Sequence, residues 1–131
     1  MMQVLSVTRQ SGIHGLGVFA VGDIPKDTLI WQFNPIIDRI IQKNEFDSLP
    51  RHAQDFVAHY SYQIDNFYVF CGDNGRYMNH SDTPNTLGLE SPDEYGITVA
   101  GRNIKAGEEL TCDYREFDDD LSRKLTENEF V

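Results

Sequence analysis

The sequence predicts a mostly β domain, and three features support this prediction. Short segments rich in β-branched and aromatic residues recur along the chain, turn residues separate them, and a single internal segment shows clear helical spacing. The chain has 131 residues, of which 40% are hydrophobic and 11% aromatic, and this suits one compact core. We therefore expect several small twisted sheets and one short helical insert.

The expected strands are short apolar segments that lie between turn signals. Clusters of Gly, Pro, Asn and Asp supply these turns, because such residues tolerate positive φ or preset the backbone of a turn. Strands of this length form several small sheets more readily than one large sheet. The expected strands are Val18–Val21, Thr28–Phe33, Ile36–Ile41, Tyr68–Cys71, Ile97–Ala100 and Leu110–Tyr114.

One segment, between Asn44 and Tyr60, interrupts this β pattern. Its apolar residues recur at i, i+3, i+4 and i+7, which is the spacing of one helical face. Pro50 fits the first turn of such a helix, where a missing backbone N–H costs little. The residues of the apolar face are Ala53, Phe56, Val57 and Tyr60.

The charge balance bears on the class of partner. The chain carries 21 Asp and Glu against 11 Lys and Arg, for a formal net charge of -10. Clustered cations are needed to follow a phosphate backbone, so nucleic acid is not an expected ligand. A negative field attracts cationic partners such as lysine-rich segments, but a high net charge also simply promotes solubility, and both explanations stay open.

Neither a membrane span nor a secretion signal is apparent in the sequence. The longest apolar runs are far shorter than a membrane helix requires, and the first ten residues lack the pattern of a signal peptide. We expect a soluble, intracellular protein with no membrane partner. The two cysteines, Cys71 and Cys112, form no Cys-x-x-Cys pair, and the histidines show no ligand spacing, so no metal site is expected.

Three motifs stand in a fixed order along the chain. Gly15–Ala20 contains a Gly-x-Gly that leads into an expected strand, so it lacks the third glycine and the helix of a dinucleotide fingerprint. Such glycines either form a tight turn or let a ligand approach the main chain. Arg76–Asn85 contains Asn-His-Ser and Pro-Asn, which taken alone indicates a surface turn. Glu109–Tyr114, taken alone, indicates a strand.

Together, these motifs resemble those of the SET-domain protein lysine methyltransferases, and the resemblance extends from about Val4 to Tyr114. It implies the SET-domain fold, in which the C-terminal motif threads through the Asn-His segment in a pseudoknot-like crossing. It also implies S-adenosylmethionine as the cofactor and Tyr114 as the catalytic residue. The cofactor-binding residues that it implies are Leu16, Gly17, Asn79, His80 and Phe117.

The resemblance further implies an aromatic channel for a lysine side chain. The aromatic rings available for its walls are Tyr60, Tyr62, Tyr68, Phe70 and Phe117. Tyr62 and Tyr68 are the expected walls, Cys112 is expected to line the channel as well, and which rings complete it stays open. Many relatives carry Phe or Tyr at the position of Cys112, so the smaller side chain favours the addition of more than one methyl group. A thiol that only fills a gap in the core is the alternative.

The end of the chain departs from many relatives, because no cysteine-rich zinc module follows Tyr114. We expect a single domain over residues 1–117 and a short acidic, helical tail over residues 118–131 that closes the site. Phe117, Leu121 and Leu125 have the helical spacing for this role. The layout resembles minimal bacterial and viral members of the family, some of which are dimers, so a homodimer is a further possibility.

The expected function is transfer of methyl groups from S-adenosylmethionine to a lysine in a basic protein segment, such as a histone-like tail or another protein. The alternative is a non-catalytic SET-like β module that binds peptides or supports assembly. Methylation of an acceptor other than protein lysine is left open by these residues. The expected location is the cytoplasm for a bacterial protein, with nuclear access for a viral or eukaryotic one.

Overall fold

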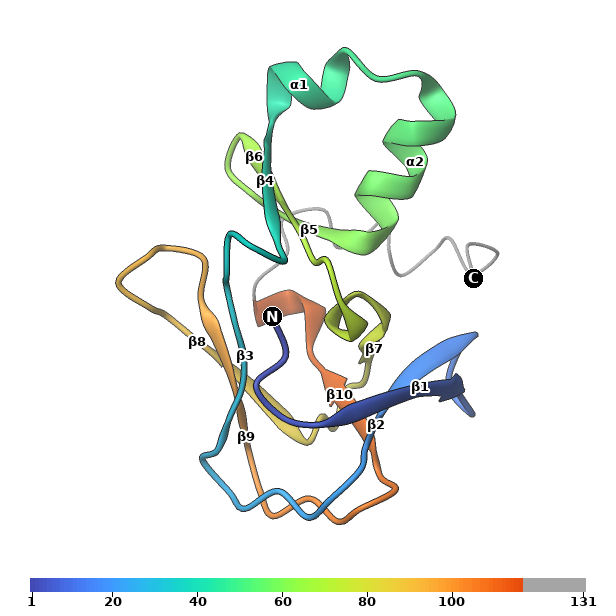
Figure 1. Ribbon diagram of the computed structural model, residues 1–131, viewed down its shortest axis with the longest axis vertical. Helices are drawn as coiled ribbons and strands as arrows, with labels where there is room; N and C mark the ends of the chain where they lie inside the picture. The colour runs from blue at the N-terminus through green and yellow to red at the C-terminus, as the bar shows by residue number, and fades with distance from the viewer. Residues whose placement is uncertain (117–131) are drawn as a thin grey trace.

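The structure is a computed structural model that describes residues 1–116, and its strands form three small sheets (Figure 1). The first sheet contains, in spatial order, β1 (Ser6–Gln10), β2 (Leu16–Ala20), β10 (Glu109–Cys112) and β7 (Asn79–His80). The second contains β3 (Leu29–Gln32), β9 (Ile97–Ala100) and β8 (Thr86–Leu89). The third contains β4 (Arg39–Gln42), β6 (Phe67–Phe70) and β5 (Ser61–Ile64). The predicted mostly β class with several small sheets is confirmed.

The helical insert consists of two helices rather than one. α1 (Lys43–Asp47) ends before Pro50, which is extended at φ -63° and ψ 154° and caps the start of α2 (Arg51–Tyr60). Pro50 therefore precedes the first turn that the sequence predicted it to join. Both helices lie at the end of the molecule that carries β4, β5 and β6 (Figure 1). Two single-turn 3₁₀ helices follow, η1 (Asn74–Tyr77) and η2 (Tyr114–Glu116).

The strand predicted over Ile36–Ile41 is wrong in its first half. Asp38 is buried, and its carboxylate accepts hydrogen bonds from the backbone N–H groups of Asn34 and Gly72, each at 3.0 Å. These bonds hold the chain in a turn before Arg39, and β4 begins only there. A buried carboxylate that needs backbone donors has overridden the β propensity of the two isoleucines.

Strands β1, β5, β7 and β8 were not predicted, because they lack a run of apolar residues or are very short. β1 is the clearest case: Ser6–Gln10 is mostly polar, yet all five residues pair with β2 in antiparallel register. The strand predicted over Leu110–Tyr114 starts one residue earlier and ends at Cys112, so Tyr114 lies in η2.

The segment from residue 79 to residue 86 crosses from one edge of β10 to the other. Asn79 and His80 pair with β10 in parallel, and the N–H of Ser81 donates to the carbonyl of Cys112. The side chains of Asn85 and Thr86 donate to the carbonyls of Glu109 and Thr111.

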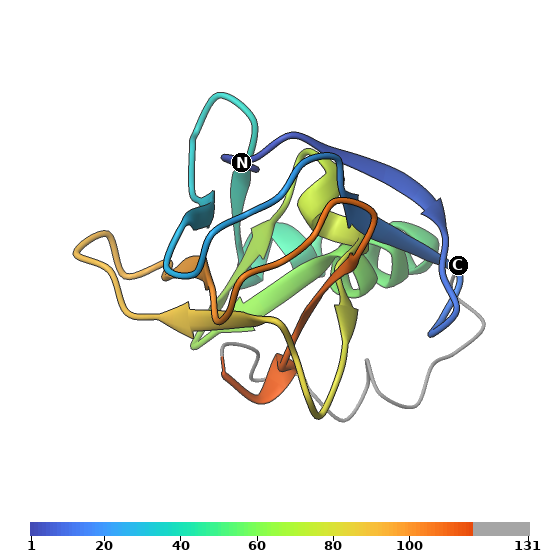
Figure 2. The ribbon, with the colours of Figure 1, turned by 90° about the horizontal axis from the view of Figure 1, so that it is seen from below.

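Backbone groups of neighbouring strand residues point to opposite edges. The carbonyl of Cys112 therefore faces one edge of β10, and the carbonyls of Glu109 and Thr111 face the other. The crossing segment and β10 lie together in both views (Figures 1 and 2), and this arrangement is the crossing that the resemblance implied.

Three apolar clusters underlie the three sheets. The largest joins the first and second sheets and includes Val18 of β2, Ile30 of β3 and Leu110 of β10, each 0% exposed. A second joins Trp31, Tyr62 and Val69, and a third packs the two helices against Tyr68. In the described part of the chain, no helix has the length and apolar character needed to cross a membrane.

Candidate active site

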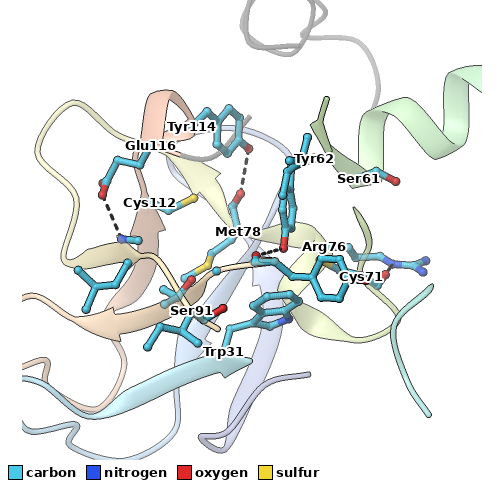
Figure 3. A pocket seen from close by; sticks show the side chains of 18 of the residues that line it. Trp31, Ser61, Tyr62, Cys71, Arg76, Met78, Ser91, Cys112, Tyr114 and Glu116 are labelled. Carbon is cyan, nitrogen blue, oxygen red and sulfur yellow. Dashed lines mark hydrogen bonds between the residues drawn. The ribbon is translucent and has the colours of Figure 1, made fainter. Parts of the chain in front are cut away.

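A cavity of about 910 Å³ lies where the second and third sheets meet the C-terminal part of the described chain (Figure 3). Aromatic side chains form much of its wall, including Trp31, Tyr62 and Tyr95. Cys112 and Tyr114 line it from the end of β10 and from η2. Cavities of this size and lining are typical of ligand sites.

Tyr114 lies at the border of this cavity. Its hydroxyl donates to the backbone carbonyl of Met78 at 2.9 Å (Figure 3). Its backbone N–H donates to Nδ1 of His80 at 3.1 Å. The centroids of the His80 and Tyr114 rings lie 5.3 Å apart. A phenol that gives its proton to a carbonyl presents oxygen lone pairs, and therefore acceptor character, to any ligand beside it.

Asn79 joins the glycine segment to β7. Its side chain is buried, and Nδ2 donates to the carbonyls of His14 and Leu16 at 3.0 and 3.1 Å and to Oε2 of Glu109 at 2.9 Å. Glu109 also accepts a hydrogen bond from the hydroxyl of Ser11 at 2.7 Å. This network joins residues that are far apart in the sequence, and it fixes the position of the Leu16 backbone relative to Asn79.

Ser11 and Glu109 are site residues that the sequence reasoning missed. Glu109 is the first residue of the third motif, so the sequence did indicate this position. Its hydrogen-bond partners, however, depend on the pairing between β2 and β10. The network also explains Gly17, because a Cβ there would lie 2.3 Å from Oε2 of Glu109. A different reason explains Gly15: its φ is 43°, a backbone conformation that glycine adopts more readily than other residues.

His80 lies within a group of charged side chains. Because Nδ1 accepts the N–H of Tyr114, the ring proton is assigned to Nε2, which donates to Asp82 at 3.0 Å. Asp113 lies beside the same ring, at 3.7 Å from Nδ1. Arg115 donates to the Asp113 carboxylate through Nε and Nη2, both at 2.8 Å. The hydrogen bond from Arg115 is the main cause that lowers the pKa of Asp113 to about 2.

The residues predicted from the sequence fall into two groups. Asn79 bonds to the backbone of Leu16, directly before Gly17, and His80 follows it in β7, so these four residues form one cluster beside β10. Tyr62 and Cys112 line the cavity. Tyr114 belongs to both groups, because it lines the cavity and contacts His80.

Tyr68 does not line the cavity. It is 5% exposed, and its ring stacks on Phe46 with the centroids 4.4 Å apart. Alternate residues of a strand face opposite sides of the sheet; Phe67 of the same strand reaches the cavity, so Tyr68 faces the helices. Phe117 and the tail over residues 118–131 lie outside the described residues.

Neither cysteine is in a disulfide; both are buried thiols that line the cavity. Among residues 1–116, no group of three or more His, Cys, Asp or Glu side chains is arranged to hold a metal ion.

Comparison with known proteins identifies the family of this chain. A sequence model of the SET domain matches residues 15–115. The chain belongs to the SET-domain family. The matched residues of this SET domain include the glycine segment, the crossing segment and β10. These elements build the cluster and its border with the cavity.

Named relatives are histone methyltransferases. The SET domain is 32% identical over 120 residues to the Homo sapiens histone-lysine N-methyltransferase 2D, with 85% of this chain and 2% of the relative covered. It is 30% identical over 114 residues to the Schizosaccharomyces pombe histone-lysine N-methyltransferase specific for H3 lysine-4, with 80% and 12% covered. The chain thus spans a small part of the length of these curated relatives.

Solved structures agree on the fold. A Plasmodium falciparum protein assigned as a histone methyltransferase has a TM-score of 0.59 and 25% identity, over 86% of this chain and 95% of that chain. A humanized mutant of the Chaetomium thermophilum Polycomb Repressive Complex 2 has a TM-score of 0.67 and 23% identity, over 92% and 16%. The second likeness shows the fold alone.

Substituting Gly17 tests the network around Glu109. We expect Gly17→Ala to reduce the free energy of unfolding by about 1–3 kcal/mol, because the new methyl group displaces a carboxylate that Ser11 and Asn79 hold. Gly12→Ala is the matched control, since a Cβ there meets nothing within 4 Å. Urea unfolding of the two variants measures the difference, and equal midpoints would contradict this role of Glu109.

The low pKa of Asp113 predicts a dependence of stability on pH. A carboxyl whose pKa falls from 3.8 to about 2 on folding stabilises the protein above pH 4, and this contribution disappears as the pH drops toward 2. We expect wild type to be more stable than Asp113→Asn at pH 6 and the gap to shrink with acidification. Urea midpoints at several pH values measure it. In an Arg115→Met background, the difference in stability between proteins with and without Asp113→Asn should be smaller at pH 6. An unchanged difference would show that a partner other than Arg115 lowers the pKa of Asp113.

Proposed function

We propose that this SET domain is a protein-lysine N-methyltransferase that uses S-adenosylmethionine. The observation that carries the proposal is the position of Tyr114, which contacts the Asn79–His80 cluster on one side and lines an aromatic cavity on the other. A residue in this position can lie between a methyl donor and a methyl acceptor. The histone methyltransferase relatives support the same activity.

The cluster beside β10 has the chemistry to hold this cofactor. Leu16 is 44% exposed, so a ligand can reach this residue, whereas Gly17 beside it is buried against Glu109. Asn79 uses its Nδ2 on protein acceptors and keeps its side-chain carbonyl as an acceptor for a ligand N–H. We assign Leu16, Gly17, Asn79 and His80 to the cofactor. When bound, S-adenosylmethionine supplies a methyl group on a positively charged sulfur.

The cavity would receive the lysine side chain. Trp31, Tyr62 and Tyr95 offer aromatic surface that favours a cation at the entrance and desolvates it further in. Desolvation lowers the pKa of a lysine ammonium, so its proton leaves to solvent and the amine becomes a nucleophile. Bound S-adenosylmethionine would supply the methyl carbon for this amine, and its sulfur would leave as a neutral thioether. No side chain needs to act as a general base.

Tyr114 positions the reaction rather than exchanging a proton. Its hydroxyl proton is committed to the carbonyl of Met78, so its oxygen is left as an acceptor that would orient the polarised methyl group of a bound cofactor through weak C–H···O contacts. Because the leaving group is already cationic, orientation of the two reactants accounts for most of the acceleration.

The substrate that we propose is a basic, lysine-containing protein segment, of which a histone-like tail is one case. The net charge of -10 attracts such segments, and carboxylates of Glu90 and Glu94 lie among the residues that line the cavity. Cys112 lines the cavity with a small side chain, which supports addition of more than one methyl group.

Cofactor binding is the first expected outcome. Calorimetric titration with S-adenosylmethionine should give a micromolar dissociation constant, which corresponds to a binding free energy of about -8 kcal/mol. The Asn79→Ala variant should show no heat of binding. Asn103→Ala is the control, because Asn103 is exposed and its side chain accepts the N–H of Lys26 far from the cluster. No binding to wild type, even with a lysine peptide present, would favour the non-catalytic β module.

Turnover is the second expected outcome. We expect Tyr114→Phe to lower the rate of methyl transfer at least about 100-fold, which is the effect of removing one oriented polar group from a reaction site, while cofactor affinity changes little. Transfer of labelled methyl groups to a library of peptides with one central lysine measures the rate. Tyr68→Phe is the control, because Tyr68 lies outside the cavity, and full activity in Tyr114→Phe would overturn the assigned role.

A further inference from the structure

We propose that Arg76 is a positioning residue that sets the orientation of the Tyr114 hydroxyl by fixing η1 to the helical insert. This inference rests on the proposed function. It starts from the unusual surroundings of Arg76, a cation that lines the cavity and has no carboxylate partner within residues 1–116.

Aromatic rings surround the Arg76 guanidinium. Its Cζ lies 4.8 Å from the ring centroid of Phe70, 5.5 Å from that of Tyr60 and 5.8 Å from that of Phe56. Phe56 and Tyr60 come from successive turns of α2, and their centroids are 5.0 Å apart. The Nε of Arg76 donates to the carbonyl of Cys71 at 3.0 Å. The side chain extends from η1 away from Tyr114 toward this carbonyl (Figure 3).

These contacts join η1 to elements that are separate in the fold. Phe56 and Tyr60 belong to the helical insert, and Phe70 belongs to β6 of the third sheet. A planar guanidinium can stack on several rings and still donate from its edge, which a lysine ammonium cannot do. Arg76 therefore holds η1 against both the insert and β6.

Other contacts also fix η1. The Asp73 carboxylate accepts from the backbone N–H of Gly75 at 3.1 Å and from that of Met2 at 2.8 Å. Gly75 packs so closely on Trp31 that a Cβ would lie 3.1 Å from the indole. The contacts of Arg76 with the aromatic rings add to these and connect η1 to the helical insert.

The position of η1 determines where the Tyr114 hydroxyl points. Met78 follows η1 directly, and its N–H donates to the carbonyl of Gly75 at 3.3 Å. The carbonyl of Met78 accepts the Tyr114 hydroxyl at 2.9 Å. Release of η1 from the insert would move this carbonyl and, with it, the phenol oxygen.

The cofactor cluster should be insulated from this effect. Asn79 is fixed by pairing with Thr111 and by its bonds to Glu109 and to the carbonyls of His14 and Leu16, none of which involves Arg76 or α2. Arg76 should thus affect turnover and leave cofactor affinity unchanged, which a general loss of structure would not do.

The test compares Arg76→Met with Arg76→Lys and with Arg39→Met, which removes one charge from an exposed site on β4. The substrate is the best peptide found in the lysine library. We expect Arg76→Met to lower kcat about 10- to 100-fold, as small misplacements of reacting groups do. Arg76→Lys should recover part of the loss, Arg39→Met should stay within about twofold of wild type, and affinity for S-adenosylmethionine should be equal in all four proteins.

A double variant decides whether Arg76 acts through Tyr114. In a Tyr114→Phe background, Arg76→Met should change the residual rate by less than about twofold, because the hydroxyl that it positions is gone. Equal losses in both backgrounds, or an unchanged kcat in Arg76→Met, would overturn the inference. Full activity in Tyr114→Phe, or no peptide methylated by wild type, would instead overturn the proposed function.

Discussion

The hydrogen bonds of the Glu109 carboxylate are the interaction on which the cluster around Asn79 depends. The carboxylate lies between Ser11 and Asn79, and so connects the glycine segment, β7 and β10 at one point. A half-buried carboxylate is stable only when donors surround it, and removal of a donor leaves it uncompensated. This explains why Gly17 cannot carry a side chain and why Asn79 points away from solvent. The positions of Leu16, Asn79 and His80 follow from this contact.

The cavity side depends on different forces. Its walls include edge-on aromatic rings, such as Trp31 with Tyr62, whose centroids lie 6.0 Å apart, and Phe67 with Tyr95, whose centroids lie 5.9 Å apart. The hydroxyl of Tyr62 donates to the carbonyl of Tyr95 and so ties β5 to the loop between β8 and β9. Polar contacts thus hold the cluster around Asn79 and ring packing holds the cavity, and Tyr114 is the residue through which the two meet.

The sequence was a good guide wherever a local pattern decided the structure. Apolar segments such as Ile97–Ala100 became strands, and the three motifs indicated the cluster and its border with the cavity. It was a poor guide where distant partners decided, as at Ile36 and Ile37, where the needs of the buried Asp38 produced a turn. The polar β1 is a strand only because β2 is its neighbour. Tyr68 was misplaced because the side of β6 that faces the cavity depends on how that strand packs, and one residue of register reverses it.

The crossing of β10 imposes an order on folding. The strand that completes the first sheet lies near the end of the described chain, yet it is bonded at one edge to β2 and at both edges to the segment of residues 79 to 86. During synthesis, elements whose partners precede β10 can form before Glu109 emerges, but β7, which pairs with β10, and the cluster around Asn79 cannot. Contacts between residues so distant in sequence carry a large loop-closure cost and form slowly. The protein would therefore acquire its ligand-binding capacity in a late step, all at once, and a chain interrupted before residue 109 would have most of its strands and no site.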